Sequence, residues 1–356
     1  MDMEDSYFGY YGQLQHQQNM LEDAIRTSAY QQAVLEARSV FEGKVVLDVG
    51  AGSGILSFFA AQAGARKVYA VEASAVARNA RKLVEANGYE QIIDVIESKV
   101  EALTLEAPVD IIISEPMGVF LLHERMIESF LTARDRYAKP DALMFPSSSE
   151  MFLAPFTDGV TFSDLKSRSK FWQAQEFYGL DLSAMEATAE AQIFSQPVVG
   201  GFDPNSLLTA VPAVHKISFQ SDAINSLLDF EIPFEFCSEY TGVMHGFAGW
   251  FTVSFPGGTK LSTGPSDART HWQQVRFFLR QPIAVNKHRT TIAGSLSMKA
   301  NEQRSYNITI SGKVYHDKEI PLMEFKAHFR LQDQQYLNLT AVPYTASESR
   351  EYLNLF

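Results

Sequence analysis

The stretch VLDVGAGSGIL, residues 46–56, decides the fold. It places Gly50, Gly52 and Gly54 between a buried β-strand and an apolar helix. Glycine at such a turn lets a ligand approach the backbone closely, and the free N–H groups at a helix start can bind that ligand. The third glycine comes one residue too early for the dinucleotide fingerprint, and Asp48 precedes the first by two. The loop predicts a nucleotide cofactor, and the alternative is a tight turn without a ligand.

Strands and helices alternate on both sides of this loop. KVYAVEAS (67–74) predicts a second strand that ends at Glu72, an acid able to bind both hydroxyls of a ribose. AVARNARKLVEANG (75–88) predicts a helix, and IIDVIESKV (92–100) and VDIIISEPM (109–117) predict further strands. This alternation is typical of a parallel, doubly wound α/β sheet.

The segments before and after this alternation have different hydrophobic patterns. Residues 1–40 contain no proline and show helical periodicity. After Pro146, apolar and alternating segments separated by Gly, Pro and Asn predict an antiparallel β-sandwich or barrel, interrupted by a helical insertion at 162–192. We expect three parts: a helical cofactor lid (1–40), a Rossmann-like domain (41–145) and a β-barrel-like domain (146–356) with an arm at about 158–190.

Composition limits the partners, compartment and cofactors that we expect for this chain. The 356 residues carry a net charge of −12, with a pI of about 5.2, which disfavours non-specific nucleic-acid binding and favours a basic partner. The single cysteine, Cys237, permits no internal disulfide and fits a reducing compartment. No Cys/His spacing suggests a metal. No apolar run approaches the roughly 20 residues of a membrane span.

A pair of glutamates follows the strand at 109–114. SEPMGVFLLHERM (114–126) sets Glu115 and Glu124 nine residues apart in a mostly apolar run, where acids are rarely buried without a partner. Two carboxylates can perform acid–base catalysis or bind a metal, for which His123 is the one further ligand nearby. They can also clamp a guanidinium, whose fork of N–H donors matches carboxylates.

These motifs resemble a known family. The glycine loop resembles motif I of class I S-adenosylmethionine-dependent methyltransferases, and the glutamate segment resembles the double-glutamate loop of the protein arginine methyltransferases. The match is nearest to their coactivator-associated branch, through YFGYYGQLQHQQNMLEDAIRT (7–27), residues 46–74 and DARTHW (267–272).

The resemblance implies a type I protein arginine methyltransferase. Such an enzyme transfers methyl groups from S-adenosylmethionine to an arginine guanidino nitrogen by in-line displacement. The products are mono- and then asymmetric dimethylarginine, with S-adenosylhomocysteine released and no metal involved. The resemblance further implies substrates such as histone tails or RNA-binding proteins, location in nucleus and cytoplasm, and a head-to-tail homodimer through the arm, without membrane or direct nucleic-acid binding.

The resemblance also implies roles for particular residues. Glu115 and Glu124 would hold the guanidinium, Asp23 and His271 would help to remove its proton, and Met20 and Met126 would flank the acceptor pocket. The cofactor would be bound by a larger set: Tyr7, Phe8, Tyr11, Gln17, Met20, Arg26, Asp48, Gly50, Gly52, Glu72, Val100, Glu101, Glu115, Met126 and Ser129. Within it, Arg26 would bind the methionine carboxylate, Glu72 the ribose, and Val100 and Glu101 the adenine.

Some features depart from the family or allow another interpretation. Val119 replaces a usual tyrosine, Ala51 replaces a cysteine, and residues after Phe329 have no clear counterpart. Taken alone, His271 is more typical of a packed core histidine, and the methionines of core filling. The rival functions are a nucleic-acid methyltransferase, an NAD-dependent oxidoreductase, and a catalytically weak scaffold that reads arginine-rich tails.

Overall fold

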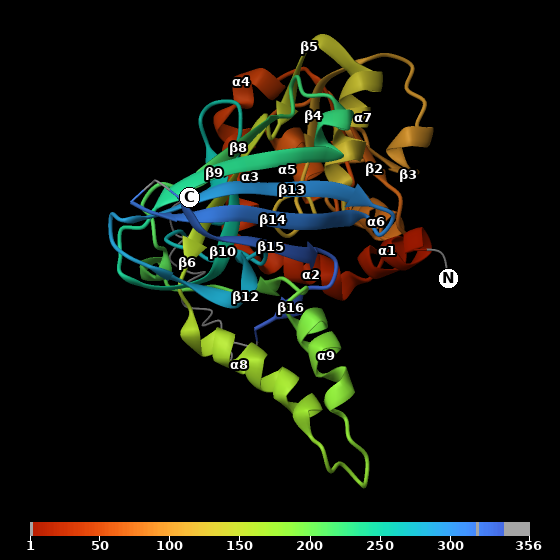
Figure 1. The fold of residues 1–356 in the computed structure, drawn as a ribbon. Helices are drawn as coiled ribbons and strands as arrows, with labels where there is room; N and C mark the ends of the chain where they lie inside the picture. The colour runs from red at the N-terminus through yellow and green to blue at the C-terminus, as the bar shows by residue number, and fades with distance from the viewer. Residues whose placement is uncertain (1–2, 318–319, 338–356) are drawn as a thin grey trace.

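The structure, a computed structural model, describes residues 3–317 and 320–337 (Figure 1). The chain begins with helices α1 (Met3–Tyr11), α2 (Leu14–Glu22), α3 (Ala24–Glu36) and α4 (Arg38–Phe41). Asp23 ends α2 and caps α3, because its side chain accepts the backbone N–H of Arg26. The predicted helical start of the chain is therefore several short helices joined by tight breaks.

A five-stranded parallel sheet follows, in the order β3-β2-β1-β4-β5. Its elements are β1 (Val45–Val49), α5 (Ile55–Gln62), β2 (Lys67–Glu72), α6 (Ala77–Ala86), β3 (Ile93–Glu97), β4 (Val109–Ser114), α7 (Met126–Tyr137) and β5 (Ala138–Phe145). Helix α5 packs on α3 and the β1–β3 side, and α7 packs on β4 and β5. The strand order reverses between β1 and β4, which is where ligands bind in open α/β sheets.

Two antiparallel layers form the second half. A seven-stranded sheet contains β6 (Ser148–Phe156), β7 (Val198–Val199), β8 (Ala213–Ser218), β10 (Gly242–Ser254), β11 (Lys260–Ser262), β12 (Val275–Val285) and β16 (Gln335–Tyr336), of which β16 lies parallel to β7. A four-stranded sheet contains β9 (Asp229–Cys237), β13 (Thr290–Asn301), β14 (Ser305–His316) and β15 (Pro321–Arg330). Aromatic side chains join the layers, with Phe247 of β10 against Phe234 of β9 and Phe277 of β12 against Phe329 of β15.

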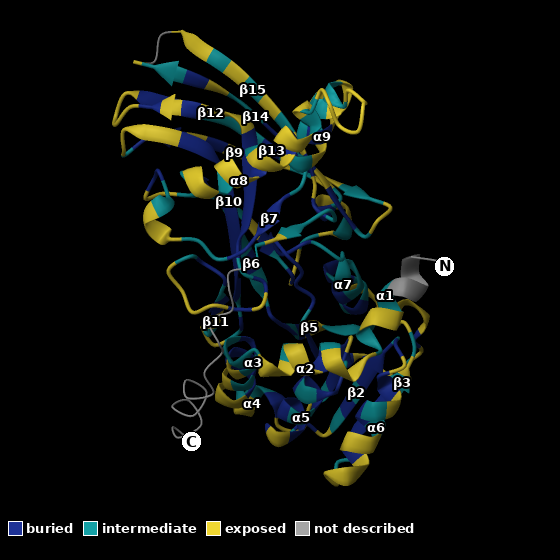
Figure 2. Ribbon diagram, turned by 90° about the horizontal axis from the view of Figure 1, so that it is seen from below, coloured by how far each residue is buried: buried dark blue, intermediate teal, exposed yellow. Residues whose placement is uncertain are grey.

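The helical insertion projects from the second half as an arm. It consists of α8 (Gly159–Lys170) and α9 (Glu186–Ile193), joined by a long loop, and Figure 1 shows both helices extending away from the sheets. The strands of the parallel sheet and β10 are mostly buried, whereas β15 and the arm carry many exposed residues (Figure 2). Apolar side chains are exposed near its tip, and Tyr178 is 93% exposed. The two helices of the arm and the segment between them thus cover residues 159–193.

The architecture confirms the predicted fold class, a parallel α/β sheet followed by an antiparallel β domain. Of the unassigned residues after Phe329, 335–336 form β16 beside β7, and 338–356 lie outside the described residues. Within the described part of the chain, no helix is long and apolar enough to cross a membrane.

Candidate active site

A cavity of about 550 Å³ lies at the carboxyl ends of β1 and β4. Its wall includes every predicted site residue except Asp23 and Asp48. These are the glutamates Glu115 and Glu124, the loop residues Gly50 and Gly52, and Tyr7, Phe8, Tyr11, Gln17, Met20, Arg26, Glu72, Val100, Glu101, Met126, Ser129 and His271. Residues from α1, the parallel sheet and the loop before β12 therefore meet at one place.

The glycine loop leaves no room for side chains. Gly50 and Gly52 adopt φ values of +69° and +55°, which disfavour other residues. A Cβ on Gly50 would lie 2.1 Å from Met126 Cε, and one on Gly52 would lie 2.6 Å from Gln17 Oε1. Gln17 itself accepts the Ser53 N–H at 3.1 Å, so α2 packs directly over the loop.

The two acids near this loop have different surroundings. Glu72 lines the cavity and accepts the N–H groups of Gly52 (2.9 Å) and Ser74 (2.6 Å). Asp48 is fully buried behind the wall, where it accepts the Ser57 hydroxyl at 2.7 Å. Burial raises the pKa of Asp48 to about 7. Asp48 is not part of the cavity wall and contacts Ser57 of α5, so its contact with a cofactor stays a prediction.

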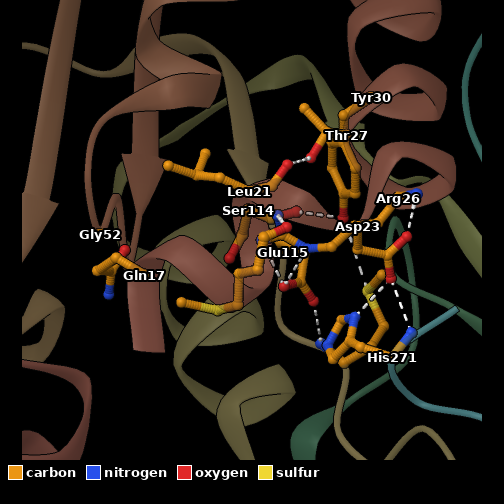
Figure 3. A network of polar contacts seen from close by, with 12 residues as sticks. Gln17, Leu21, Asp23, Arg26, Thr27, Tyr30, Gly52, Ser114, Glu115 and His271 are labelled. Carbon is orange, nitrogen blue, oxygen red and sulfur yellow. Dashed lines mark hydrogen bonds and ion pairs between the residues drawn. The ribbon is translucent and has the colours of Figure 1, made fainter. Parts of the chain in front are cut away.

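Glu115 already binds a guanidinium, that of Arg26 from α3. Arg26 donates Nε–H and Nη2–H to Glu115 Oε2 at 2.9 and 2.7 Å (Figure 3), and Nη1–H to the Met20 carbonyl at 3.2 Å. Burial alone would lower the pKa of Arg26, but the Glu115 carboxylate raises it above its usual range. Arg26, predicted as a ligand of the cofactor carboxylate, thus also orients one half of the glutamate pair.

Glu124 is bound by helix α1. The Tyr11 hydroxyl lies 2.9 and 2.7 Å from its two carboxylate oxygens, and the Tyr7 hydroxyl also interacts with it. Burial raises the pKa of Glu124, the charge of Glu115 adds to this effect, and both tyrosine hydroxyls oppose it. A cation placed between the two carboxylates would relieve their repulsion.

The loop that carries Glu124 has an unusual backbone. Phe120, Leu121, Glu124 and Arg125 all have positive φ, from +50° to +74°. Such conformations are costly for residues other than glycine and cluster at functional sites. Gly118 permits the tight fold-back, because a Cβ there would lie 2.0 Å from the His123 carbonyl oxygen.

Asp23 and His271 form the predicted pair although 248 positions separate them. Asp23 Oδ2 accepts His271 N–H at 2.8 Å and lies 2.7 Å from His271 Nδ1 (Figure 3). Burial alone would raise the pKa of Asp23, but hydrogen bonds from His271 and Arg26 hold it below its usual range. The next residue, Trp272, donates its indole N–H to the Met117 carbonyl at 2.9 Å and ties this loop to the glutamate segment. His271 is thus a cavity-wall residue and not a packed core histidine.

The remaining predicted residues close the cavity. Met20 and Met126 lie on its wall, and Ser129 donates a hydrogen bond to Glu101 at 2.7 Å. Val119 lies on the wall at the position where the family pattern has tyrosine. Among the wall residues that sequence reasoning missed are Arg304 and Tyr336, which come from the β domain and belong to no motif. Among the described residues, no group of three His, Cys, Asp or Glu side chains could hold a metal.

Comparisons with known proteins agree with this geometry. Residues 148–316 match the family model of the arginine methyltransferase oligomerization subdomain, and residues 5–129 match that of ribosomal protein L11 methyltransferase. Over 358 residues, the chain is 43% identical to the probable histone-arginine methyltransferase CARM1 of Oryza sativa subsp. indica, covering 98% of this chain and 67% of that protein. This chain belongs to the protein arginine methyltransferase family.

Other relatives place it in the same branch. It is 48% identical over 315 residues to the probable histone-arginine methyltransferase 1.3 of Arabidopsis thaliana, covering 87% of this chain and 58% of that protein. It is 45% identical over 307 residues to the histone-arginine methyltransferase CARMER of Drosophila grimshawi, covering 85% of this chain and 56% of that protein. These relatives confirm the predicted family and branch. The chain spans between about half and two thirds of the length of these relatives.

Solved structures support the fold. Protein arginine methyltransferase 10 of Arabidopsis thaliana, described in a uniquely open conformation, matches with a TM-score of 0.83 and 32% identity, covering 91% of this chain and 100% of that one. The Trypanosoma brucei PRMT1 enzyme–prozyme heterotetrameric complex with AdoHcy matches with a TM-score of 0.79 and 33% identity, covering 90% of this chain and 99% of the matched chain.

Proposed function

We propose that this protein is a type I, S-adenosylmethionine-dependent protein-arginine N-methyltransferase that forms mono- and then asymmetric dimethylarginine. The observation that carries the proposal is that Glu115 and Glu124 line the same cavity as the glycine loop. One carboxylate already accepts two N–H groups of a guanidinium. An arginine acceptor would therefore meet a carboxylate pair beside a nucleotide-type binding loop.

The cavity residues fit S-adenosylmethionine. Gly50 and Gly52 lie on the cavity wall and carry no side chain, so their backbone could approach the amino-acid end of the cofactor. Glu72, which lines the cavity, would bind the ribose hydroxyls, and Arg26 would bind the carboxylate of the methionine part. When bound, the cofactor supplies an electrophilic sulfonium methyl group, and S-adenosylhomocysteine is its product.

The two glutamates would bind and polarise the acceptor. The arginine guanidinium stays charged at neutral pH. Carboxylates bound along one side concentrate its positive charge there, so the remaining nitrogen becomes the better nucleophile. Fixed orientation between two carboxylates adds to the rate through positioning and preorganised electrostatics. Met20 and Met126, as flexible apolar walls, would leave room for a second methyl group on the same nitrogen.

The Asp23–His271 pair would take up the proton that the acceptor nitrogen loses. Asp23 holds His271 through both its backbone N–H and Nδ1. An ionised carboxylate at Nδ1 favours a proton on that nitrogen and leaves Nε2 able to accept one. This arrangement resembles the way in which a carboxylate orients histidine in other general-base pairs.

Substrates, location, domain limits and assembly belong to the same proposal. The net charge of −12 favours basic partners. By similarity to the named relatives, these would be histone tails or RNA-binding proteins, in the nucleus and cytoplasm. We retain the division into 1–40, 41–145 and 146–356. Exposed apolar residues at the arm tip, including Tyr178 and Leu180, support a homodimer closed by two identical arm contacts.

The dimer has its own test. Tyr178→Asp should convert a dimer to a monomer in gel filtration with light scattering. Val160→Asp is the matched control, because Val160 is an exposed apolar residue at the arm's base. A wild-type monomer at working concentration would contradict the dimer.

Product analysis tests the reaction. The protein would be incubated with S-adenosylmethionine and either a histone H3 tail or a Gly/Arg-rich peptide, and the methylarginines separated after hydrolysis. Asymmetric dimethylarginine is expected. Monomethyl or symmetric product would overturn the argument from Met20 and Met126, and cofactor binding without any methylarginine would favour the scaffold.

A further inference from the structure

The turn between β13 and β14 reaches from the four-stranded sheet to the cavity wall. Asn301 Oδ1 closes this turn by accepting the N–H groups of Gln303 (2.9 Å) and Ser305 (3.2 Å). Arg304 has a φ of +50°, in the left-handed region, and its side chain lines the cavity. Arg304 has no part in the acceptor binding, cofactor binding or proton uptake proposed for the other wall residues.

Two contacts fasten the turn to the glutamate loop. Arg125 donates Nη1–H to the Asn301 carbonyl at 2.8 Å, and His123 Nδ1 lies 2.9 Å from Ser305 Oγ. His123 and Arg125 are the residues on either side of Glu124. The turn is therefore held at a fixed place relative to that carboxylate.

The Arg304 guanidinium lies on the lid helix. Its Cζ is 4.4 Å from the centroid of the Tyr7 ring, well within the range of a cation–π contact. Its Nε is buried and has no hydrogen-bond acceptor among the described residues, so the ring face is its main contact. The Tyr7 hydroxyl in turn interacts with Glu124, which makes a chain from the turn through α1 to the glutamate loop.

The charge of Arg304 acts on both of these neighbours. Burial raises the pKa values of Tyr7 and Glu124, and the nearby Arg304 cation opposes that rise in each. The titratable and charged groups around Glu124 come from five segments: Tyr7, Tyr10 and Tyr11 of α1, Glu115 after β4, its partner Arg26 of α3, Arg304, and Tyr336 of β16. Within this set, Arg26 forms a salt bridge with Glu115, whereas Arg304 forms none among the described residues.

We propose that Arg304 is a positioning residue that latches helix α1 onto the glutamate loop and keeps Glu124 ready for a guanidinium. The role of Glu124 in binding a guanidinium rests on the proposed function. A helix of nine residues is marginal on its own, so tertiary contacts such as the one at Tyr7 determine how often α1 is docked. The β domain thereby contributes to closing a cavity built mainly from the other half of the chain.

The first test does not depend on activity. Hydrogen exchange of residues 7–11 would be compared in the wild type, Arg304→Gln and Arg304→Lys, without ligand. We expect exchange to become about 5- to 30-fold faster in Arg304→Gln and to return toward the wild-type rate in Arg304→Lys, which keeps the cation. Gln303→Ala, an exposed neighbour in the same turn, should leave the rate unchanged.

The second test uses methyl transfer. Loss of the Arg304 cation should raise the Glu124 pKa, so the acid limb of the kcat/KM profile should move to higher pH in Arg304→Gln and stay in place in Arg304→Lys. Unchanged exchange in Arg304→Gln would overturn the latch, and an unmoved acid limb would overturn the effect on Glu124. If the wild type transfers no methyl group, exchange still decides the latch while the proposed function fails. Should Arg304→Gln not fold, Tyr7→Leu removes the ring face instead, and unchanged exchange there would likewise refute the latch.

Discussion

Replacing Glu124 with glutamine should separate activity from stability. The substitution keeps the shape of the side chain and an oxygen that can accept the Tyr11 hydroxyl, now 2.9 and 2.7 Å from the two carboxylate oxygens. It removes the negative charge that would bind one side of the acceptor guanidinium. A charge-assisted hydrogen bond in a partly buried site contributes about 2–4 kcal/mol. We therefore expect kcat/KM to fall by roughly 30- to 1,000-fold, at 1.4 kcal/mol for each factor of ten.

The same substitution should not lower the stability of the fold. Burial raises the pKa of Glu124 above its value in the unfolded chain, so the protonated form is favoured in the folded state. Stability therefore falls as the pH rises through the unfolded pKa and levels off above the folded one. At pH 7.5 the wild type bears this cost and Glu124→Gln does not. The variant should unfold at the same temperature as the wild type or slightly above it.

The assay compares initial rates on the better peptide substrate, S-adenosylhomocysteine affinity by calorimetry, and thermal unfolding. Glu128→Gln is the matched control, because Glu128 pairs with Arg125 on the same segment but does not line the cavity. Near-normal turnover in Glu124→Gln would refute the guanidinium clamp. A loss of several degrees in unfolding temperature would instead show that the carboxylate stabilises the fold.

Two further predictions concern the neighbouring groups. Asp23→Asn should lower kcat about 10- to 100-fold by releasing His271. Because the pKa of Asp23 is depressed in the folded state, its carboxylate stabilises the fold above about pH 4, and this effect is lost as the pH falls through the folded pKa. The unfolding temperature should therefore fall less in the variant than in the wild type between pH 6 and pH 3. An equal fall in both proteins would contradict this. Gly50→Ala should weaken S-adenosylhomocysteine binding at least about tenfold, because the new Cβ, 2.1 Å from Met126 Cε, would push that side chain out of its place on the cavity wall. Gly43→Ala is its control, since Gly43 has a similar φ of +71° with nothing within 4 Å, and equal binding losses in the two variants would rule out the steric explanation.

Much of the site could be predicted because its chemistry is encoded in short segments. The glycine loop, Glu72 and the two glutamates each follow a strand of the parallel sheet, and the carboxyl ends of such strands meet at one edge. The approach of Asp23 to His271 could be expected only through the family resemblance, since 248 residues separate them. No local pattern brings such distant residues together.

Other parts of the site could not be predicted from any local signal. Asp48 looks like a ligand beside the glycine loop, yet the same spacing suits a buried acid that accepts the Ser57 hydroxyl. Arg304 lies in a hairpin turn whose sequence, NEQRS, is typical of an ordinary exposed turn. Its place on the cavity wall depends on how the four-stranded sheet sits against α1, which is a property of packing rather than of the residues around it.

The glutamate loop explains why the site needs both halves of the chain. Four of its residues have positive φ, and each costs about 1 kcal/mol or more. The contacts that hold this backbone come largely from the β domain: Trp272 donates to the Met117 carbonyl, Arg125 donates to the Asn301 carbonyl, and His123 contacts Ser305. A hydrogen bond of this kind contributes about 1 kcal/mol, so these anchors offset part of the strain. The parallel sheet alone can present the glycine loop and Glu72, but the spacing of the two carboxylates depends on strands that follow more than 100 residues later.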